Sequence, residues 1–183
     1  MERIGSTLPV QFAALGFLCE RPMHGYELRT RLEEGLGSLW RIASSQLYNV
    51  LHRMEERGWV SSKLEPGERH ASRTTYTATP AGLSELQAWL ETPVQHLRDM
   101  RVEFFAKTYF LRRRSLRQVG ELVDAQIALF QRREAGLTDG ADIHSNDEAF
   151  AQAVASFRRR RIGNMIEWLQ AMRDELMERE EDE

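Results

Sequence analysis

The chain has 183 residues, 42% of them hydrophobic, which is enough for one domain or two small ones with a real core. Its single cysteine, Cys19, excludes an intrachain disulfide, and no secretory signal or membrane-length apolar run is visible, so we expect a cytoplasmic protein. The net charge is −3, and residues 1–91 hold 10 Lys and Arg against 11 Asp and Glu, so any attraction for a polyanion must come from a local patch.

Two short helices are predicted before residue 40. Apolar residues crowd positions 10–18, which indicates a helix buried on most sides, and Ser6 or Thr7 can cap its start. The second helix follows a turn at His24-Gly25 and ends at Gly35 and Gly37. Its apolar residues recur every four positions, as expected for one buried face: Leu28, Leu32 and Leu36.

The stretch SSQLYNVLHRMEERGWV, residues 44–60, predicts a third helix with two different faces. Ser44 is its expected N-cap and Gly58 its expected stop. The buried stripe has the spacing i, i+3, i+4 and i+7: Leu47, Val50, Leu51 and Met54. The positions opposite that stripe, and those beside them, are polar or aromatic: Ser45, Asn49, His52 and Glu56, flanked by Gln46, Tyr48 and Arg53.

Residues 60–78 change from a helical period to alternation. Two β-rich runs flank the glycine-containing loop EPGERHAS, which predicts a β-hairpin. Thr79-Pro80 then begins a fourth helix, AGLSELQAWLE, which ends at Thr92-Pro93. Four basic residues lie in or beside the hairpin loop: Lys63, Arg69, His70 and Arg73.

The order helix, helix, helix, hairpin, helix over residues 8–91 predicts a winged helix-turn-helix. The third helix packs through one stripe and presents Ser, Gln, Tyr, Asn, His and Arg outward. The major groove of DNA admits one helix, and its floor offers base edges and thymine methyls to such side chains. We therefore assign residues 1–92 to a DNA-binding domain, and the fold class is mainly α with a small β-hairpin.

Residues 93–183 are predicted to be an all-helical dimerisation and effector domain that ends in the acidic tail EREEDE. Ser115 with Gln118, and Ser145 with Glu148, are expected capping boxes. The first of them precedes a helix of about 20 residues with its own stripe: Leu116, Val119, Leu122, Val123, Ile127 and Phe130. A second stripe of near-heptad spacing runs for about 40 Å and needs a partner along it, so we assign dimerisation to its residues: Phe150, Val154, Phe157, Ile162, Met165, Leu169, Met172 and Leu176.

The chain resembles the PadR family of bacterial transcriptional regulators. The matching stretches are HGYEL (24–28), SSQLYNVLHRMEERGWV (44–60) and TYTATPAG (75–82), and the resemblance covers residues 8–91. QAWLETPV (87–94), followed by a helical remainder, looks like the larger members, whose C-terminal domain is of the virulence-activator type.

The resemblance implies a homodimeric regulator, a repressor in our expectation, whose two recognition helices enter successive major grooves of a near-palindromic operator. The wing departs from the Gly-Arg-Pro-Arg-like pattern of many members, because the stretch here is GERHASRTTY and its nearest equivalents are Arg69 and Arg73. Glu65 and Glu68 in the same loop would repel phosphate. The expected DNA contacts are Tyr26, Ser44, Ser45, Gln46, Tyr48, Asn49, Arg53, Lys63, Arg69 and Arg73.

Several of these residues have a second interpretation. Ser45 and Asn49 suit base edges or phosphates, and Arg53 suits a phosphate. Tyr48 can touch a thymine methyl or a phosphate, or lean back onto the core. Tyr26 can contact a phosphate or pack the second helix on the first.

Trp89 and Trp168 are candidate walls for a small aromatic effector, which the resemblance suggests, and their alternative role is core or dimer packing. The arginine runs 112–114 and 158–161 each circle a helix. They form either a solvated surface with acidic partners or contacts to flanking DNA or the acidic tail.

No catalytic residue, metal site or cofactor is predicted. The five histidines are scattered, and no phosphate-binding glycine loop or nucleophile elbow occurs. Two alternatives to the repressor remain: a winged-helix module that binds protein, and an activator with no small-molecule ligand.

Overall fold

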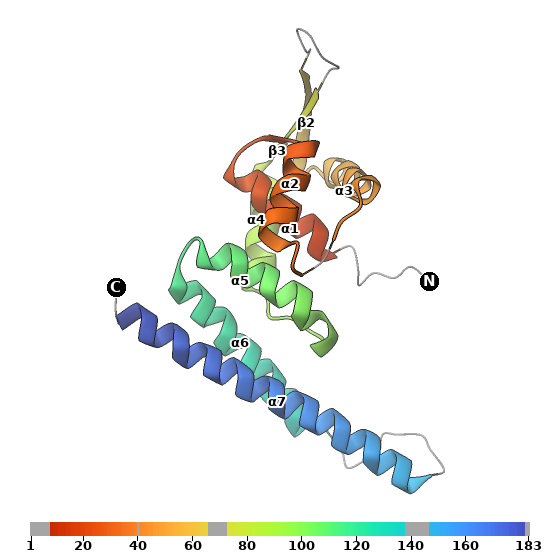
Figure 1. Cartoon of the computed structure of the whole chain (residues 1–183), viewed down its shortest axis with the longest axis vertical. Coiled ribbons are helices and arrows are strands. Elements are labelled where there is room, and N and C mark those ends of the chain that lie inside the picture. Colours follow the sequence, from red (N-terminus) through yellow and green to blue (C-terminus); the bar gives the residue numbers. More distant parts are fainter. Residues whose placement is uncertain (1–7, 40, 66–72, 138–146, 182–183) are drawn as a thin grey trace. The chain divides into compact units, whose positions relative to one another are not determined.

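The structure is a computed structural model that describes residues 8–39, 41–65, 73–137 and 147–181. It divides into two compact units, one made of Met1–Thr92 with Arg98–Phe110 and the other of Pro93–Leu97 with Leu111–Glu183. Residues 98–110 therefore belong with the N-terminal unit, whereas the sequence-based division placed them in the C-terminal domain. Figure 1 shows the chain from its first helix to its last.

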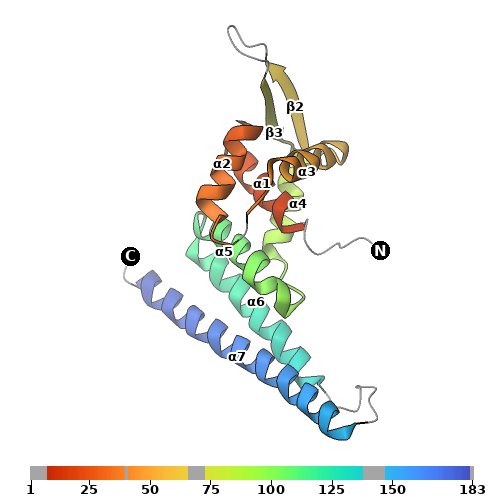
Figure 2. The same cartoon turned by 45° about the vertical axis from the view of Figure 1, so that its right-hand side comes forward.

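The first unit is a winged helix. Its elements follow in the order α1 (Leu8–Glu20), β1 (Met23–His24), α2 (Gly25–Leu36), α3 (Ser44–Glu56), β2 (Val60–Glu65), β3 (Arg73–Ala78) and α4 (Pro80–Glu91). The β2–β3 hairpin, here called the wing, extends from the helices close to α3 (Figure 2). Its strands are antiparallel, in a register that runs from Val60 opposite Ala78 to Glu65 opposite Arg73.

A third strand replaces the turn that the sequence predicted at His24-Gly25. Met23 pairs with Tyr76 and His24 with Thr75, so the sheet order is β1-β3-β2. The Nδ1 atom of His24 lies 3.0 Å from the Thr75 hydroxyl, which adds a side-chain contact to the ladder. A two-residue strand leaves no periodic pattern in a sequence, so alternation could not reveal it.

The core of the first unit surrounds α1, which is buried on nearly all sides as its composition predicts. The predicted stripe of α2 is buried, and so is that of α3. Gly35 lies inside α2 and only Gly37 caps it. The chain continues through a 3-10 turn (Leu97–Asp99), a π-helical turn (Met100–Phe104) and α5 (Phe105–Arg112). The Phe110 ring packs so closely on Gly16 that a Cβ there would lie 2.6 Å from it.

The helix ends confirm two predicted signals and correct two others. Thr79 caps α4 by accepting a hydrogen bond from the Gly82 amide at 3.1 Å, and Gly58 ends α3 with a φ of +71°. Ser44 is not the N-cap of α3, because Ala43 holds that position. Ser115 is the N-cap of α6 but makes no side-chain capping bond, so the predicted capping box is absent. Ser6, Thr7 and Ser145 lie outside the described residues.

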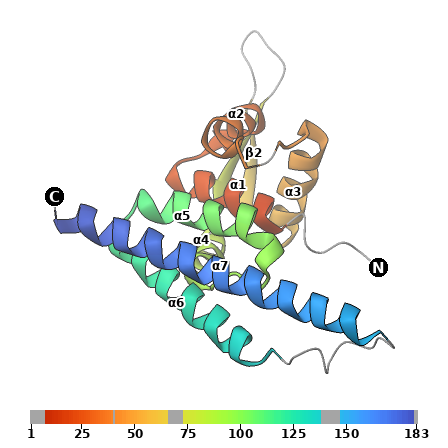
Figure 3. The ribbon, with the colours of Figure 1, turned by 60° about the horizontal axis from the view of Figure 1, so that its bottom comes forward.

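The second unit is built on two long helices, α6 (Leu116–Ala135) and α7 (Glu148–Glu181). They lie side by side and antiparallel (Figure 3), and an ion pair of 3.3 Å between Arg173 and Asp124 joins them. Asp147 accepts a hydrogen bond from the Phe150 amide at 3.1 Å and so caps the start of α7. The predicted stripe of α6 is buried apart from half-buried Leu116, and Gln126 is buried beside it.

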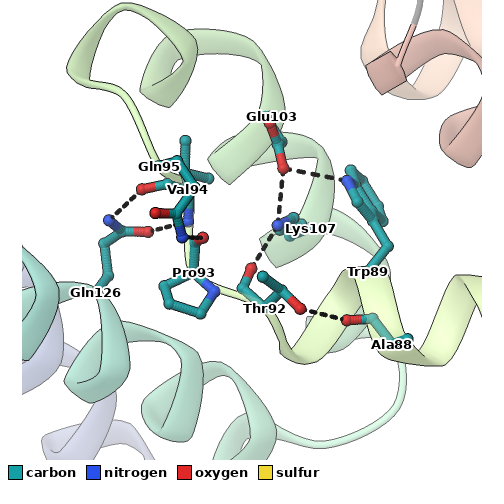
Figure 4. Close-up of polar contacts among 9 residues, drawn as sticks. All are labelled: Ala88, Trp89, Thr92, Pro93, Val94, Gln95, Glu103, Lys107 and Gln126. Carbon is teal, nitrogen blue, oxygen red and sulfur yellow. Dashed lines mark hydrogen bonds and ion pairs between the residues drawn. The ribbon is translucent and has the colours of Figure 1, made fainter.

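Buried polar side chains hold the chain on each side of Pro93 (Figure 4). In the first unit, the ammonium of Lys107 donates to the Thr92 carbonyl and pairs with Glu103 at 2.8 Å. In the second unit, Gln126 accepts from the Val94 amide at 2.6 Å and donates to the Val94 carbonyl at 2.9 Å. Both polar groups of a buried backbone residue are thus satisfied by one side chain.

Candidate nucleic-acid interface

Helix α3 presents the polar face that its sequence predicts. Leu47, Val50, Leu51 and Met54 are buried, which fixes the rotation of the helix about its axis. The opposite face is open, and 49% of the Tyr48 surface is exposed. The predicted contacts on that face are exposed except for half-buried Gln46: Ser44, Ser45, Tyr48, Asn49 and Arg53.

Neighbouring elements fasten α3 at both ends. Near its start, Arg29 of α2 donates to the Ser44 hydroxyl at 3.3 Å. Near its end, the Ser62 hydroxyl of β2 donates to the Glu55 carboxylate at 2.6 Å. The structure gives that carboxylate a partner on the wing, so the helix and the wing are held together.

A groove of about 600 Å³ brings together three of the predicted contacts from three different elements. Tyr26 comes from α2, Tyr48 from α3 and Arg73 from β3. Tyr26 is 71% exposed and Arg73 is exposed as well. The remaining lining residues are His24, Gly25, Glu27 and Thr74. The sequence separates these groups by up to about fifty positions, so only the fold shows that they share one groove.

Gly25 allows the Tyr48 ring to lie against the start of α2. A Cβ at position 25 would lie 2.8 Å from the ring, closer than van der Waals contact permits. The sequence left open whether Tyr48 contacts DNA or leans back onto the core. The packing shows that its ring leans on α2 and that its exposed half faces the groove.

The negative charges near the groove have partners. Glu27 pairs with Arg21, and the hydrogen bond from that guanidinium lowers the pKa of the Glu27 carboxyl. Burial, and then the charge of Glu55, raise the pKa of the Tyr76 phenol, which keeps it neutral. An anion in the groove would therefore meet a paired carboxylate, hydroxyl groups and Arg73.

Arg29 is a cation that the sequence-based list of contacts omitted. Its guanidinium lies 5.5 Å from the centre of the Tyr26 ring, besides its bond to Ser44. The sequence feature that could have identified Arg29 is its spacing of three residues from Tyr26 on a predicted helix, because side chains at that spacing are neighbours.

The wing carries the remaining predicted contacts. Lys63 and Arg73 are exposed, and Lys63 lies opposite Thr75 in the ladder. Arg69 and Glu68 lie outside the described residues. Glu65 is exposed on the same hairpin.

The two candidate ligand-contacting tryptophans have different surroundings. Trp89 is 7% exposed and stacks on Phe12 with ring centroids 4.8 Å apart. Its indole N–H donates to Glu103 at 3.1 Å, so within the first unit it packs as a core residue. Trp168 belongs to the second unit, where 40% of its surface is exposed on α7.

The stripe predicted for dimerisation divides between two faces of α7. Ile162 and Leu169 are already buried within the unit and present no free surface. Phe150 and Phe157 are 57% and 59% exposed. The other four members are half-buried: Val154, Met165, Met172 and Leu176. At about 100° per residue, Phe150 and Leu169 lie about 100° apart, so the predicted stripe is a broad band that is exposed along one edge and buried along the other.

The part of the chain that the structure describes contains neither a metal site nor a membrane-spanning helix. Among the described residues, no three His, Cys, Asp or Glu side chains are grouped as metal ligands would be. Likewise, none of the helices described is both long and apolar enough to cross a membrane.

Comparison with known proteins shows what the first unit is similar to. The model of the transcriptional regulator PadR-like family matches residues 14–88, which includes α3 and the wing. This part of the chain is therefore similar to the PadR-like family. The curated relatives are named as transcriptional regulators.

Two curated relatives extend the match. The negative transcriptional regulator PadR of Bacillus subtilis is 28% identical over 130 residues, which are 71% of this chain and 70% of that protein. A "probable transcriptional regulator" of Mycobacterium tuberculosis is 30% identical over 89 residues, 49% of this chain and 47% of the relative. The chain thus spans about half of the second relative.

Two solved structures are also similar to this chain. Bacillus subtilis PadR in complex with operator DNA matches with 22% identity over 91% of this chain and 98% of that one, at a TM-score of 0.46. A transcriptional regulator of Thermoplasma acidophilum matches with 36% identity over 48% of this chain and 81% of that one, at a TM-score of 0.42.

Proposed function

We propose that this protein is a homodimeric transcriptional repressor that reads a near-palindromic operator with α3 and the wing. The observation that carries the proposal is the arrangement on its PadR-like domain: an exposed polar α3 face beside a groove that unites Tyr26, Tyr48 and Arg73. A helix of this kind fits the major groove, and side chains at its edges can meet the phosphates.

The exposed residues of α3 take different roles in this proposal. Ser45 and Asn49 lie opposite the buried stripe, so they reach deepest and contact base edges. Arg53 lies about two turns beyond Ser45 and one turn beyond Asn49. Its Nε atom donates to the Asn49 carbonyl at 3.3 Å. That bond directs the side chain along the helix, where its guanidinium contacts a phosphate. Ser44 and Gln46 support the same surface.

The groove beside α3 receives the DNA backbone. Tyr26, Tyr48 and Arg73 supply two phenol groups and one guanidinium around it. Lys63 and Arg69 of the wing contact the flanking phosphates. The nearly balanced charge of residues 1–91 is compatible with this role, because Arg21 offsets Glu27 and the Ser62 hydroxyl engages Glu55.

The names of the relatives support the proposed repression, and the exposed apolar side chains of α7 support the proposed dimer. The B. subtilis relative is named a negative transcriptional regulator, and it has been solved with operator DNA. A homodimer places two copies of α3 on one duplex, so the half-sites should lie about 10 bp apart or at a multiple of that spacing. Binding to chromosomal DNA places the protein in the bacterial cytoplasm.

A small aromatic effector is part of the proposal. The B. subtilis relative has also been solved with p-coumaric acid, a planar aromatic acid. Such an effector would act by changing the affinity for the operator. Titration of p-coumaric acid into the protein–operator complex tests this, and an affinity that stays constant up to millimolar acid would remove the effector from the account.

Selection from random duplex DNA tests the DNA-binding function, followed by affinity against salt for the enriched site and for a scrambled duplex. We expect a two-fold-symmetric site bound by two protomers, with affinity that falls steeply as salt rises because phosphate contacts release counterions. Failure to enrich any sequence, together with salt-independent capture of a protein by the α3 face, would show instead a protein-binding module.

A further inference from the structure

His52 and Glu56 lie at the centre of the exposed face of α3, and neither is among the predicted DNA contacts. At about 100° per residue, both fall within about 20° of Ser45 around the helix axis, directly opposite the buried stripe. Their side chains are 72% and 60% exposed. They therefore occupy the same face that the proposed function gives to base reading.

The two side chains form a pair along the helix. Nε2 of His52 lies 3.4 Å from Oε1 of Glu56, one turn further on. Within the described residues this is the one contact of the Glu56 carboxylate, so its second oxygen has no protein donor there. The neighbouring charges are held elsewhere, because Glu55 accepts from a wing hydroxyl at 2.6 Å and Arg57 donates to Gln11 of α1 at 3.4 Å. An open hydrogen-bond acceptor therefore stands on the outer face of α3.

A carboxylate at this place is unfavourable beside most DNA. It carries the same charge as the phosphates, and it accepts hydrogen bonds but cannot donate them. In the major groove, guanine and thymine offer acceptors, so the donors that remain are the amino groups of cytosine and adenine. The adenine amino group lies beside N7, whose lone pair repels a carboxylate, whereas that of cytosine lies beside a C–H of its ring. Cytosine is therefore the base that suits Glu56 best.

We infer that Glu56 reads a cytosine in the operator by accepting a hydrogen bond from its 4-amino group, and that His52 is the positioning residue. The inference rests on the proposed function, which places α3 in the major groove. Glu56 lies about 16 Å beyond Ser45 along the helix axis, so the two residues read different base pairs. A sequence without cytosine at this place meets an uncompensated negative charge, so the carboxylate discriminates by repulsion as well as by attraction.

His52 determines where the carboxylate lies. Its N–H engages one oxygen and leaves the other for the DNA, whereas an unpaired glutamate side chain can turn away from the groove floor. Gln87 and Glu91 on α4 form a pair with the same four-residue spacing, in which the glutamine amide donates at 2.5 Å. The variant His52→Gln should therefore keep the pair, and His52→Ala should lose it.

The first test compares, by fluorescence anisotropy, the affinity for the operator enriched from random DNA with the affinity for a scrambled duplex. Glu56→Ala removes a negative charge, so it should bind the scrambled duplex more tightly than the wild type does. It also loses the cytosine contact, so the ratio of the two affinities should fall about tenfold. Glu85→Ala, an exposed glutamate on α4, is the matched control and should leave that ratio unchanged. Unchanged helicity by circular dichroism shows that the variants fold.

The second test removes one functional group from the DNA. Pyrimidin-2-one pairs with guanine but lacks the 4-amino group, and it replaces the cytosine at the operator position where Glu56→Ala loses its preference in the selection. The wild type and His52→Gln should bind this duplex about tenfold more weakly than the natural operator. Glu56→Ala and His52→Ala should bind the two duplexes equally well.

The outcomes separate this inference from the function on which it rests. A wild type that enriches a two-fold-symmetric site, with an unchanged affinity ratio for Glu56→Ala, overturns the role of Glu56 and leaves the DNA-reading function intact. A wild type that enriches no site overturns both. Loss of preference at a base other than cytosine overturns the base assignment, and equal behaviour of His52→Ala and His52→Gln overturns the positioning role. A loss of affinity with pyrimidin-2-one that Glu56→Ala does not share establishes the contact.

Discussion

Gly25 has no side chain, and this absence determines how the Tyr48 ring lies. The aromatic ring occupies the space that a Cβ would need, which joins the start of α2 to α3. The motif HGYEL therefore has a structural meaning in this chain: the glycine receives Tyr48, and the tyrosine after it lies in the same groove.

Gly25→Ala should weaken operator binding about tenfold with little effect on folding. The Tyr48 ring is half exposed and can swing away, so the free energy of unfolding should fall by less than about 1 kcal/mol. Gly120→Ala in α6 is the matched control, because its Cβ meets nothing within 4 Å. It should stabilise the helix by up to about 1 kcal/mol and leave DNA affinity unchanged. Urea unfolding and fluorescence anisotropy measure the two effects, and equal DNA affinity of both variants would contradict the role of Gly25.

Lys107 is a buried cation whose side chain is 1% exposed. Burial lowers the pKa of its ammonium, although Glu103 opposes the shift. Between the lowered folded pKa and the ordinary value of 10.5, the unfolded chain binds more protons than the folded one. Stability from this residue must therefore increase with pH in that window.

The variant Lys107→Met should lose that pH dependence. It also leaves the Thr92 carbonyl without its donor, which should cost about 1–3 kcal/mol at neutral pH. Urea unfolding of both proteins from pH 7 to 10.5 gives the comparison. The difference between them should widen with pH, and a constant difference would mean that Lys107 stays charged throughout.

Among the elements, those with a clear period were predictable and those fixed by distant partners were not. The stripes of α2, α3 and α6, the wing hairpin and the Thr79 cap follow from residue spacing and local chemistry. Strand β1 is two residues long and exists because β3 pairs with it. No pattern in the sequence marks Gln126 as important, yet its side chain forms hydrogen bonds with both the amide and the carbonyl of Val94. Ser115 matches a capping box, and the folded chain does not use it.

Gln126→Leu should destabilise the helical unit by about 2–4 kcal/mol. The change preserves side-chain volume but leaves a buried N–H and C=O of Val94 unpaired. Gln152→Leu, on the exposed surface of α7, is the control and should change stability by less than about 0.5 kcal/mol. Thermal unfolding followed by circular dichroism distinguishes them, and equal melting temperatures would show that Val94 finds other partners.

For the whole molecule, the sequence predicts the class of protein more readily than it predicts which residues come together in the site. The order of elements and the polar face of α3 predicted a DNA-reading winged helix, and the match to the PadR-like family over residues 14–88 agrees. The groove required tertiary structure, because Tyr26, Tyr48 and Arg73 come from three elements. The stripe predicted on α7 is buried along one edge and exposed along the other, because a heptad count does not show which apolar side chains α6 already covers.

The central claim is that Ser45 and Asn49 of α3 read the base sequence. The most direct measurement is selection from random duplex DNA with three proteins: wild type, the variant with Ser45→Ala and Asn49→Ala, and Arg53→Ala. We predict that the wild type and Arg53→Ala enrich the same two-fold-symmetric site, with Arg53→Ala binding every sequence more weakly. The double alanine variant should keep salt-dependent DNA binding but lose about 1–3 kcal/mol of discrimination per contacted base, so its motif is relaxed. If the double variant instead enriches the wild-type site unchanged, α3 is not the element that reads the operator.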